Sequence, residues 1–168
     1  MDDLIYNQRE IPKEQWRYGF RSSAATGCGW IATYNALRLM NYYAKPEDLI
    51  RYYERQLPLI HGNCGTTIPG PALFFMQKGF DVKLTARRAD FERAVKESDV
   101  SILFYRWRRG LKLGAHFVTV RYTDGRFVGY NTYRNSAGAD DYGGSLAEFL
   151  KQRRYFGAVL ISIRDKRK

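Results

Sequence analysis

A cysteine at the expected start of a helix is the residue of this 168-residue chain best suited to chemistry. Cys28 lies between Gly27 and Gly29, and an apolar stripe with helical spacing begins directly after it. Unpaired N–H groups and a partial positive charge at a helix N-terminus favour the thiolate, which is the nucleophilic form of cysteine. The flanking glycines are expected to allow a sharp backbone turn that keeps the sulfur accessible. A small buried residue that merely starts a helix is the alternative interpretation.

His116 is the expected base for this thiol, and a hairpin supplies its expected partner. His116 opens an apolar strand that Asp-Gly at 124–125, a strong two-residue hairpin signal, joins to a strand ending at Asn131. In that register His116 faces Tyr133, and Asn131 is its diagonal neighbour on the same face. The side-chain amide of Asn131 is then expected to hold the tautomer of the ring. A core histidine and a turn asparagine are the plainer alternatives.

A second thiol, Cys64, lies in the run His-Gly-Asn-Cys-Gly at 61–65. Catalytic partners normally come from separate elements, so a cleft loop or a structural turn is favoured here over a catalytic centre. A Cys28–Cys64 disulfide would need an oxidising compartment. The two cysteines together with His61 and His116 match the spacing of no zinc module, so no metal site is expected.

Helical patterns occupy the first half of the chain and strand patterns the second, which predicts a single α+β domain over residues 1–168. After a loop at 22–27, helices are expected at 28–43, from 46 to before 58, at 71–78, 91–96 and 146–151, and strands at 80–84, 100–105, 116–122, 127–131 and 156–163.

The formal charge of +11, from 28 Lys and Arg against 17 Asp and Glu, favours acidic partners such as nucleic acid or anionic surfaces. Because the basic residues are scattered, a solvated basic surface is the favoured interpretation, and only residues 105–109, Tyr-Arg-Trp-Arg-Arg, interleave aromatic and basic side chains. Nucleic acid is therefore disfavoured but left open. No apolar stretch approaches a membrane span, and no signal peptide is recognisable. A cytoplasmic location is expected if Met1 is the native start, and secretion if a signal peptide was removed.

The order Cys28, His116, Asn131 resembles that of the papain-like cysteine peptidases, which have the nucleophile on an N-terminal helix and the other two residues on an antiparallel sheet. Gly-Cys-Gly at 27–29 and His-Phe-Val at 116–118 resemble the bacterial group of bacteriocin leader peptidases, also called double-glycine peptidases, over roughly residues 7–133. The resemblance implies a papain-like fold and hydrolysis of a peptide or amide bond by a Cys-His-Asn triad without a cofactor. Acyl transfer by the same residues, or a non-catalytic module that binds an acidic partner, are the alternatives.

The resemblance also implies an oxyanion hole made by the Cys28 backbone N–H and an upstream glutamine amide. Because Ser22 stands six residues before Cys28, where a glutamine is most familiar, Gln8 is the candidate donor and Gln15 the reserve.

The remaining expectations concern the surroundings of the site. Tyr133 is expected to shield the His–Asn hydrogen bond from water, and Trp30 to shield or line the cleft. The segments 62–70 and 106–113 are also expected to line it, and the positive charge of 106–113 indicates an acidic or carboxylate-bearing substrate.

Overall fold

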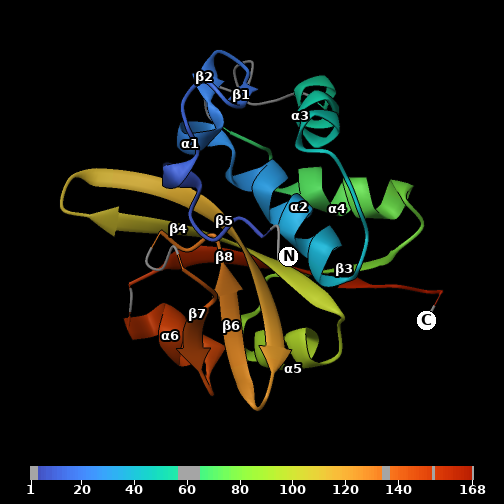
Figure 1. The fold of residues 1–168 in the computed structure, drawn as a ribbon. Helices are drawn as coiled ribbons and strands as arrows, with labels where there is room; N and C mark the ends of the chain where they lie inside the picture. The colour runs from blue at the N-terminus through green and yellow to red at the C-terminus, as the bar shows by residue number, and fades with distance from the viewer. Residues whose placement is uncertain (1–3, 57–64, 134–136, 153, 168) are drawn as a thin grey trace.

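A six-stranded antiparallel sheet with helices on both faces forms the body of the protein (Figure 1). The computed structural model describes residues 4–56, 65–133, 137–152 and 154–167. The helical elements are η1 (Gln8–Glu10), α1 (Ser23–Thr26), α2 (Cys28–Leu39), α3 (Pro46–Arg55), α4 (Pro69–Gln77), η2 (Arg88–Asp90), α5 (Phe91–Lys96) and α6 (Leu146–Gln152). The strands are β1 (Arg17–Tyr18), β2 (Arg21–Ser22), β3 (Asp81–Thr85), β4 (Val100–Arg109), β5 (Lys112–Thr123), β6 (Arg126–Tyr130), β7 (Asp140–Gly143) and β8 (Phe156–Arg164).

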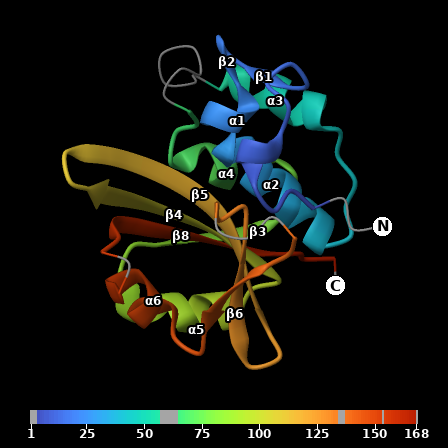
Figure 2. The same cartoon turned by 60° about the vertical axis from the view of Figure 1, so that its left-hand side comes forward.

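The strand order is β3-β8-β4-β5-β6-β7, and β1 with β2 forms a separate small hairpin. Helices α2 and α4 contact one side of the sheet, with α3 packed on α2, whereas α5 and α6 lie against the other (Figures 1 and 2). The expected α+β class, with an N-terminal helical half on an antiparallel sheet, is confirmed. No helix among the described residues combines the length and apolarity needed to cross a membrane.

The helix that carries Cys28 begins at the expected residue, but its C-terminal end and the segment before it differ from expectation. Helix α2 ends at Leu39, four residues earlier than predicted, and Asn41 two residues later has a left-handed φ of 66°. The loop expected at 22–27 is wrong, because residues 23–26 form one helical turn closed by a hydrogen bond of 2.9 Å from Gly27 N to Ser23 O. Cys28 therefore follows a short helix directly.

The β5–β6 hairpin has the register that the sequence predicts. Its ladder pairs Thr123 with Arg126 at the turn and Thr119 with Tyr130 at the far end. Both loop residues have positive φ, 50° at Asp124 and 78° at Gly125, as a two-residue hairpin of type I′ requires. The register confirms the expected alignment of β5 with β6 up to the point where the site begins.

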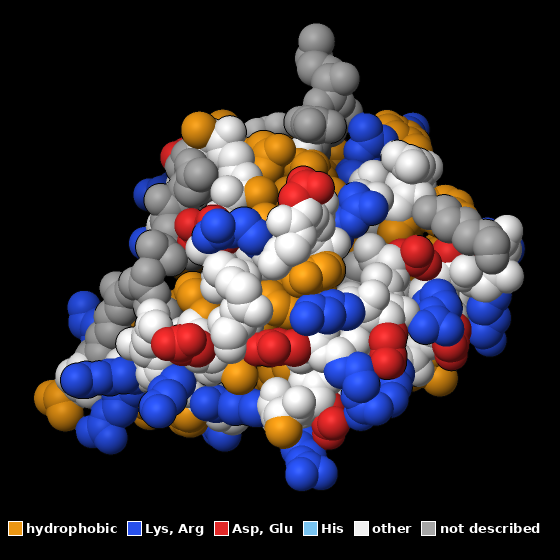
Figure 3. Space-filling model, turned by 90° about the horizontal axis from the view of Figure 1, so that it is seen from below, with side chains coloured by type: hydrophobic (Ala, Val, Ile, Leu, Met, Phe, Trp, Pro, Cys, Tyr) orange, Lys and Arg blue, Asp and Glu red, His pale blue; other side chains and the backbone are white. Residues whose placement is uncertain are grey.

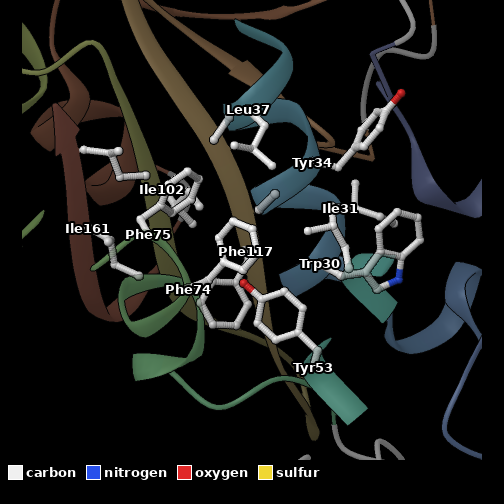
Figure 4. Packing of buried hydrophobic residues seen from close by; sticks show 14 of the residues in the cluster. Trp30, Ile31, Tyr34, Leu37, Tyr53, Phe74, Phe75, Ile102, Phe117 and Ile161 are labelled. Carbon is white, nitrogen blue, oxygen red and sulfur yellow. The ribbon is translucent and has the colours of Figure 1, made fainter. Parts of the chain in front are cut away.

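Two hydrophobic cores lie on the two sides of the sheet. Strand β5 contributes to both, because successive side chains of a strand point to opposite faces. Phe117 belongs to the core beneath α2, α3 and α4, whereas Val118 belongs to the core beneath α5 and α6. Figure 4 shows Phe117 surrounded by side chains from α2, from Tyr53 of α3 and from Phe74 of α4. A hydrogen bond of 2.9 Å from Thr119 Oγ1 to the Ala32 carbonyl also ties β5 to α2. The site strand is thus fixed from both sides.

The β4–β5 hairpin continues beyond the body of the sheet as a two-stranded arm (Figure 2). Its ladder runs out to the Arg109–Lys112 pair, whereas β8 follows β4 only as far as Arg106. Segment 106–113, expected as a cleft loop, is therefore mostly strand. Leu111 at the tip is 97% exposed.

Candidate active site

Cys28 is the first residue of α2, and its side chain is half-buried. The glycines beside it serve close packing rather than an unusual backbone conformation, since Gly27 has an ordinary φ of −78°. A Cβ on Gly29 would lie 2.3 Å from the side chain of Thr66, and one on Gly27 would lie 2.6 Å from the Ser23 carbonyl oxygen. The expectation that these glycines provide a sharp turn is corrected accordingly.

The environment of the thiol favours its neutral form. Burial raises the pKa of Cys28 to about 11, although the backbone N–H groups of Phe117, Gly29 and Cys28 itself act in the opposite direction. Desolvation of the charged form therefore outweighs the helix N-terminus that was expected to stabilise the thiolate. The contact with Phe117 also places the thiol at the residue that directly follows His116.

His116 is buried, and only one of its ring nitrogens has a partner. Nε2 lies 2.6 Å from the backbone carbonyl oxygen of Asn131. Because a carbonyl only accepts hydrogen bonds, Nε2 carries the proton and Nδ1 keeps its lone pair. Nδ1 is buried without a hydrogen-bond partner among the described residues. Burial, together with the positive charge of Arg9, lowers the pKa of His116 to about 4, although the bond to Asn131 raises it.

Asn131 contacts His116 in a way that the sequence did not predict. The expected partner of the ring was the side-chain amide, but the main-chain carbonyl makes the contact. Asn131 has a left-handed φ of 63°, and the β5–β6 ladder ends one residue before it. The departure from strand geometry turns the carbonyl toward the imidazole and leaves the amide free to bond elsewhere.

The side chain of Asn131 forms a reciprocal pair with Gln8. Asn131 Oδ1 accepts from the Gln8 backbone N–H at 2.8 Å, and Asn131 Nδ2 donates to Gln8 Oε1 at 2.9 Å. Gln8 Nε2 donates to the Ala24 carbonyl in α1 at 3.2 Å. Gln8 is therefore fully buried between the end of β6 and the helix that precedes Cys28, whereas Gln15 is exposed in a turn.

Tyr133 covers His116, as the hairpin register led us to expect. The two rings stack with centroids 4.1 Å apart and planes 24° apart. The Arg9 guanidinium carbon lies 4.2 Å from the centroid of the Tyr133 ring. Tyr133 also lies within electrostatic range of Cys28, and burial is the main cause that raises the pKa of its phenol. Arg9 is the contact at the site that the sequence analysis missed, and no spacing signal pointed to it.

Trp30 does not line a cleft. It is fully buried in the core beneath α2, where its indole N–H donates to Ser23 Oγ at 3.1 Å and its ring packs edge-on against Trp16. The expectation for Trp30 is corrected because the helical phase of α2 turns this side chain inward. The rival pair His61 and Cys64 lies outside the described residues.

The ionisation states of the site follow from these two pKa shifts. At neutral pH the Cys28 thiol, with a pKa of about 11, is protonated, and the His116 imidazole, with a pKa of about 4, is neutral. A neutral imidazole with a free lone pair is a base, and a protonated thiol is a proton donor. Within the described residues, no group of three or more His, Cys, Asp or Glu side chains is placed to hold a metal ion.

Comparison with solved structures identifies a similar fold. No protein-family model and no curated protein sequence matches the chain. The peptidase domain of Streptococcus ComA, a bi-functional ABC transporter involved in a quorum-sensing pathway, superposes with a TM-score of 0.55. The two domains share a fold. The superposition covers 83% of this chain and 91% of that domain at 14% sequence identity. The expected papain-like fold is thereby confirmed.

Proposed function

We propose that this protein cleaves a peptide or amide bond by thiol chemistry, with Cys28 as nucleophile and His116 as general base. One observation carries the proposal. His116 is anchored through Nε2 to a carbonyl, whereas Nδ1 is buried without a described partner. A buried polar atom without a partner is costly and calls for an explanation. Proton transfer with the thiol of the half-buried Cys28 at the start of α2 provides one.

In the proposed reaction, Cys28 Sγ attacks the substrate carbonyl carbon while His116 Nδ1 takes the thiol proton. The C–N bond then breaks, and the imidazolium returns that proton to the leaving amine. Water, deprotonated by His116, hydrolyses the resulting thioester and restores the thiol. The Asn131 carbonyl keeps the proton on Nε2 throughout, which leaves Nδ1 as the atom that exchanges protons.

The oxyanion is proposed to bind between the Cys28 backbone N–H and the Gln8 amide. Nε2 of Gln8 has two hydrogens, and one of them goes to the Ala24 carbonyl. The second is the proposed donor. A donor of this kind stabilises the transition state by about 3 kcal/mol in other enzymes. The reciprocal bonds to Asn131 would hold the amide in place for this role.

Incubation with a pool of synthetic peptides, analysed by mass spectrometry, tests the proposal. We expect the wild-type chain and Cys64→Ser to produce the same new termini, and Cys28→Ser to produce none. His116→Ala should slow cleavage by about 10²–10⁴-fold, the usual contribution of a positioned base. Added glycinamide separates acyl transfer from hydrolysis, because transfer leaves it attached to the new C-terminus. Loss of cleavage in Cys64→Ser with retention in Cys28→Ser would refute the assignment.

A further inference from the structure

The outermost side chain over the proposed site is a cation. Arg9 is exposed, and its guanidinium lies on the face of Tyr133, the ring that stacks on His116. The three groups therefore form a column of guanidinium, phenol and imidazole. No carboxylate among the described residues pairs with the Arg9 guanidinium, although the chain carries other Arg–Asp pairs such as Arg126–Asp141 at 2.6 Å.

Hydrogen bonds on both sides of Arg9 hold its backbone in place. Asn7 caps the turn η1 by accepting from the Arg9 backbone N–H at 3.1 Å. Gln8, the neighbouring residue, is buried and bonded to Asn131. The backbone of Arg9 is thus fixed on one side by the cap and on the other by the bonds to the end of β6. Its guanidinium then lies over the Tyr133 ring, and the exposed side chain keeps its N–H donors accessible to a ligand.

We propose that Arg9 binds a carboxylate of the substrate and so makes the protein selective for an acidic group next to the scissile bond. The proposal rests on the proposed thiol chemistry. His116 Nδ1 would protonate the leaving amine, and Tyr133 with Arg9 covers a face of the same imidazole, which brings the guanidinium near the leaving group. A stacked guanidinium offers paired N–H donors that match a carboxylate.

Two sources of the carboxylate share this chemistry, namely a C-terminal main-chain carboxylate and an Asp or Glu side chain. Matched alkylating probes distinguish them. The first pair is iodoacetylglycine and iodoacetylglycinamide, and the second is the iodoacetyl derivatives of aspartic acid α-amide and asparagine amide. Each pair differs only in a carboxylate against a carboxamide, and the rate of modification of Cys28 is read by peptide mapping, which keeps Cys64 separate.

For the wild-type chain we expect the acidic probe of one pair to react with Cys28 faster than its neutral partner, and that pair identifies the source. Arg9→Glu should reduce the acid-to-amide rate ratio by about fivefold or more, as expected for a charge pair in partly screened surroundings. Arg9→Gln should give an intermediate ratio. Lys13→Glu, an equal charge change at an exposed residue on the same segment, should leave the ratio unchanged.

One outcome would overturn the role of Arg9, and a different outcome would overturn the proposed thiol chemistry. If the ratio is the same in wild type, Arg9→Glu and Lys13→Glu for both pairs, Arg9 does not bind a carboxylate. The proposed function fails separately if the neutral probes modify Cys28 at the same rate in wild type and in His116→Ala. Because the ratio compares two probes on one variant, a change in the reactivity of the thiol itself cancels.

Discussion

At the residue scale, a main-chain atom sets the chemistry of His116. The Asn131 carbonyl can only accept, so it fixes the tautomer without help from the Asn131 side chain. The side chain is bonded to Gln8 instead and holds the N-terminal segment against the end of β6. Asn131 therefore orients the His116 imidazole through its main-chain carbonyl and attaches the N-terminal segment through its side chain.

Replacement of Asn131 by glycine separates these two tasks. Glycine keeps the carbonyl and accepts the left-handed φ of 63°, but it removes the bonds to Gln8. We expect unfolding free energy to fall by about 1–3 kcal/mol, since buried Gln8 groups lose their partners. The His116 tautomer, read from ¹⁵N chemical shifts assigned against His116→Ala, should stay protonated at Nε2. A switch to Nδ1–H in the variant would show that the side chain sets the tautomer.

Several residue-level features were predictable because they follow from local rules. The register of β5 against β6 as far as Tyr130 follows from the two-residue turn and from side-chain alternation. The stacking of Tyr133 on His116 lies beyond this ladder, where Asn131 and Tyr133 both have left-handed φ. The role of the Asn131 carbonyl was not predictable, because it depends on a backbone angle that no pattern encodes. The contact of Arg9 with Tyr133 joins segments more than a hundred residues apart and has no signature in the sequence.

At the element scale, the start of α2 is positioned by close packing. Gly29 faces the Thr66 side chain at a distance that leaves no room for a Cβ, and Thr66 Oγ1 in turn lies 3.1 Å from the hydroxyl of Tyr18. The first turn of α2 therefore rests on the segment that leads into α4. A shift of this contact moves Cys28 relative to His116.

Substitution of Gly29 by alanine tests the packing at this helix start. The added Cβ would lie 2.3 Å from Thr66 Oγ1, so one of the two elements must move. We expect a loss of about 1–3 kcal/mol in unfolding free energy, the usual cost of overpacking, with slower modification of Cys28. Gly144→Ala is the matched control, since its Cβ meets nothing within 4 Å. Equal unfolding midpoints in urea for the two variants would contradict the packing argument.

The elements also show where local signals are incomplete. Ser145 and Glu148 have the spacing of a capping box, and Ser145 caps α6 because its Oγ accepts from the Glu148 backbone N–H at 3.2 Å. The carboxylate that bonds this capping residue comes from Glu92 of α5, whose Oε1 accepts from Ser145 Oγ at 2.7 Å. Glu148 bonds Gln152 instead. In a capping box the carboxylate belongs to the third residue of the same helix, Glu148 here. In this protein the carboxylate that bonds Ser145 belongs to a neighbouring helix instead.

At the scale of the whole molecule, the site lies at the edge where the N-terminal segment meets the sheet. Two reciprocal amide pairs attach this segment. Asn35 in α2 bonds both backbone groups of Ile5, with Ile5 N to Oδ1 at 2.9 Å and Nδ2 to Ile5 O at 2.8 Å. Asn131 bonds the backbone N–H of Gln8 and, in contrast, its side-chain Oε1. The segment thereby joins the helical half to the sheet directly beside Cys28 and His116.

The distribution of charge bears on the alternative of a non-catalytic, nucleic-acid-binding module. On the face seen in Figure 3, Lys and Arg side chains are mixed with Asp and Glu. A single-stranded nucleic-acid site instead uses a continuous cationic groove with stacked aromatic rings. The overall excess of positive charge was readable from composition, whereas its mixing with acidic residues on this face required the fold.

The central claim is that His116 acts as the base for Cys28, and the pH dependence of Cys28 alkylation by iodoacetamide tests it most directly. With a His116 pKa of about 4 and a Cys28 pKa of about 11, the base is deprotonated and the thiol protonated at every pH between these values. In the wild-type chain the rate should therefore hold a plateau around neutral pH and fall only as the pH drops toward about 4, where His116 gains its proton.

In His116→Ala, the rate should be about 10²-fold lower or more at neutral pH, since a positioned base contributes 10²–10⁴-fold. It should rise about tenfold with each pH unit and level off only above about 11, because the unaided reaction follows the fraction of thiolate. Peptide mapping assigns the modification to Cys28. Distinct profiles with the neutral plateau in the wild type alone would support the account, and superimposable profiles for the two proteins would contradict it.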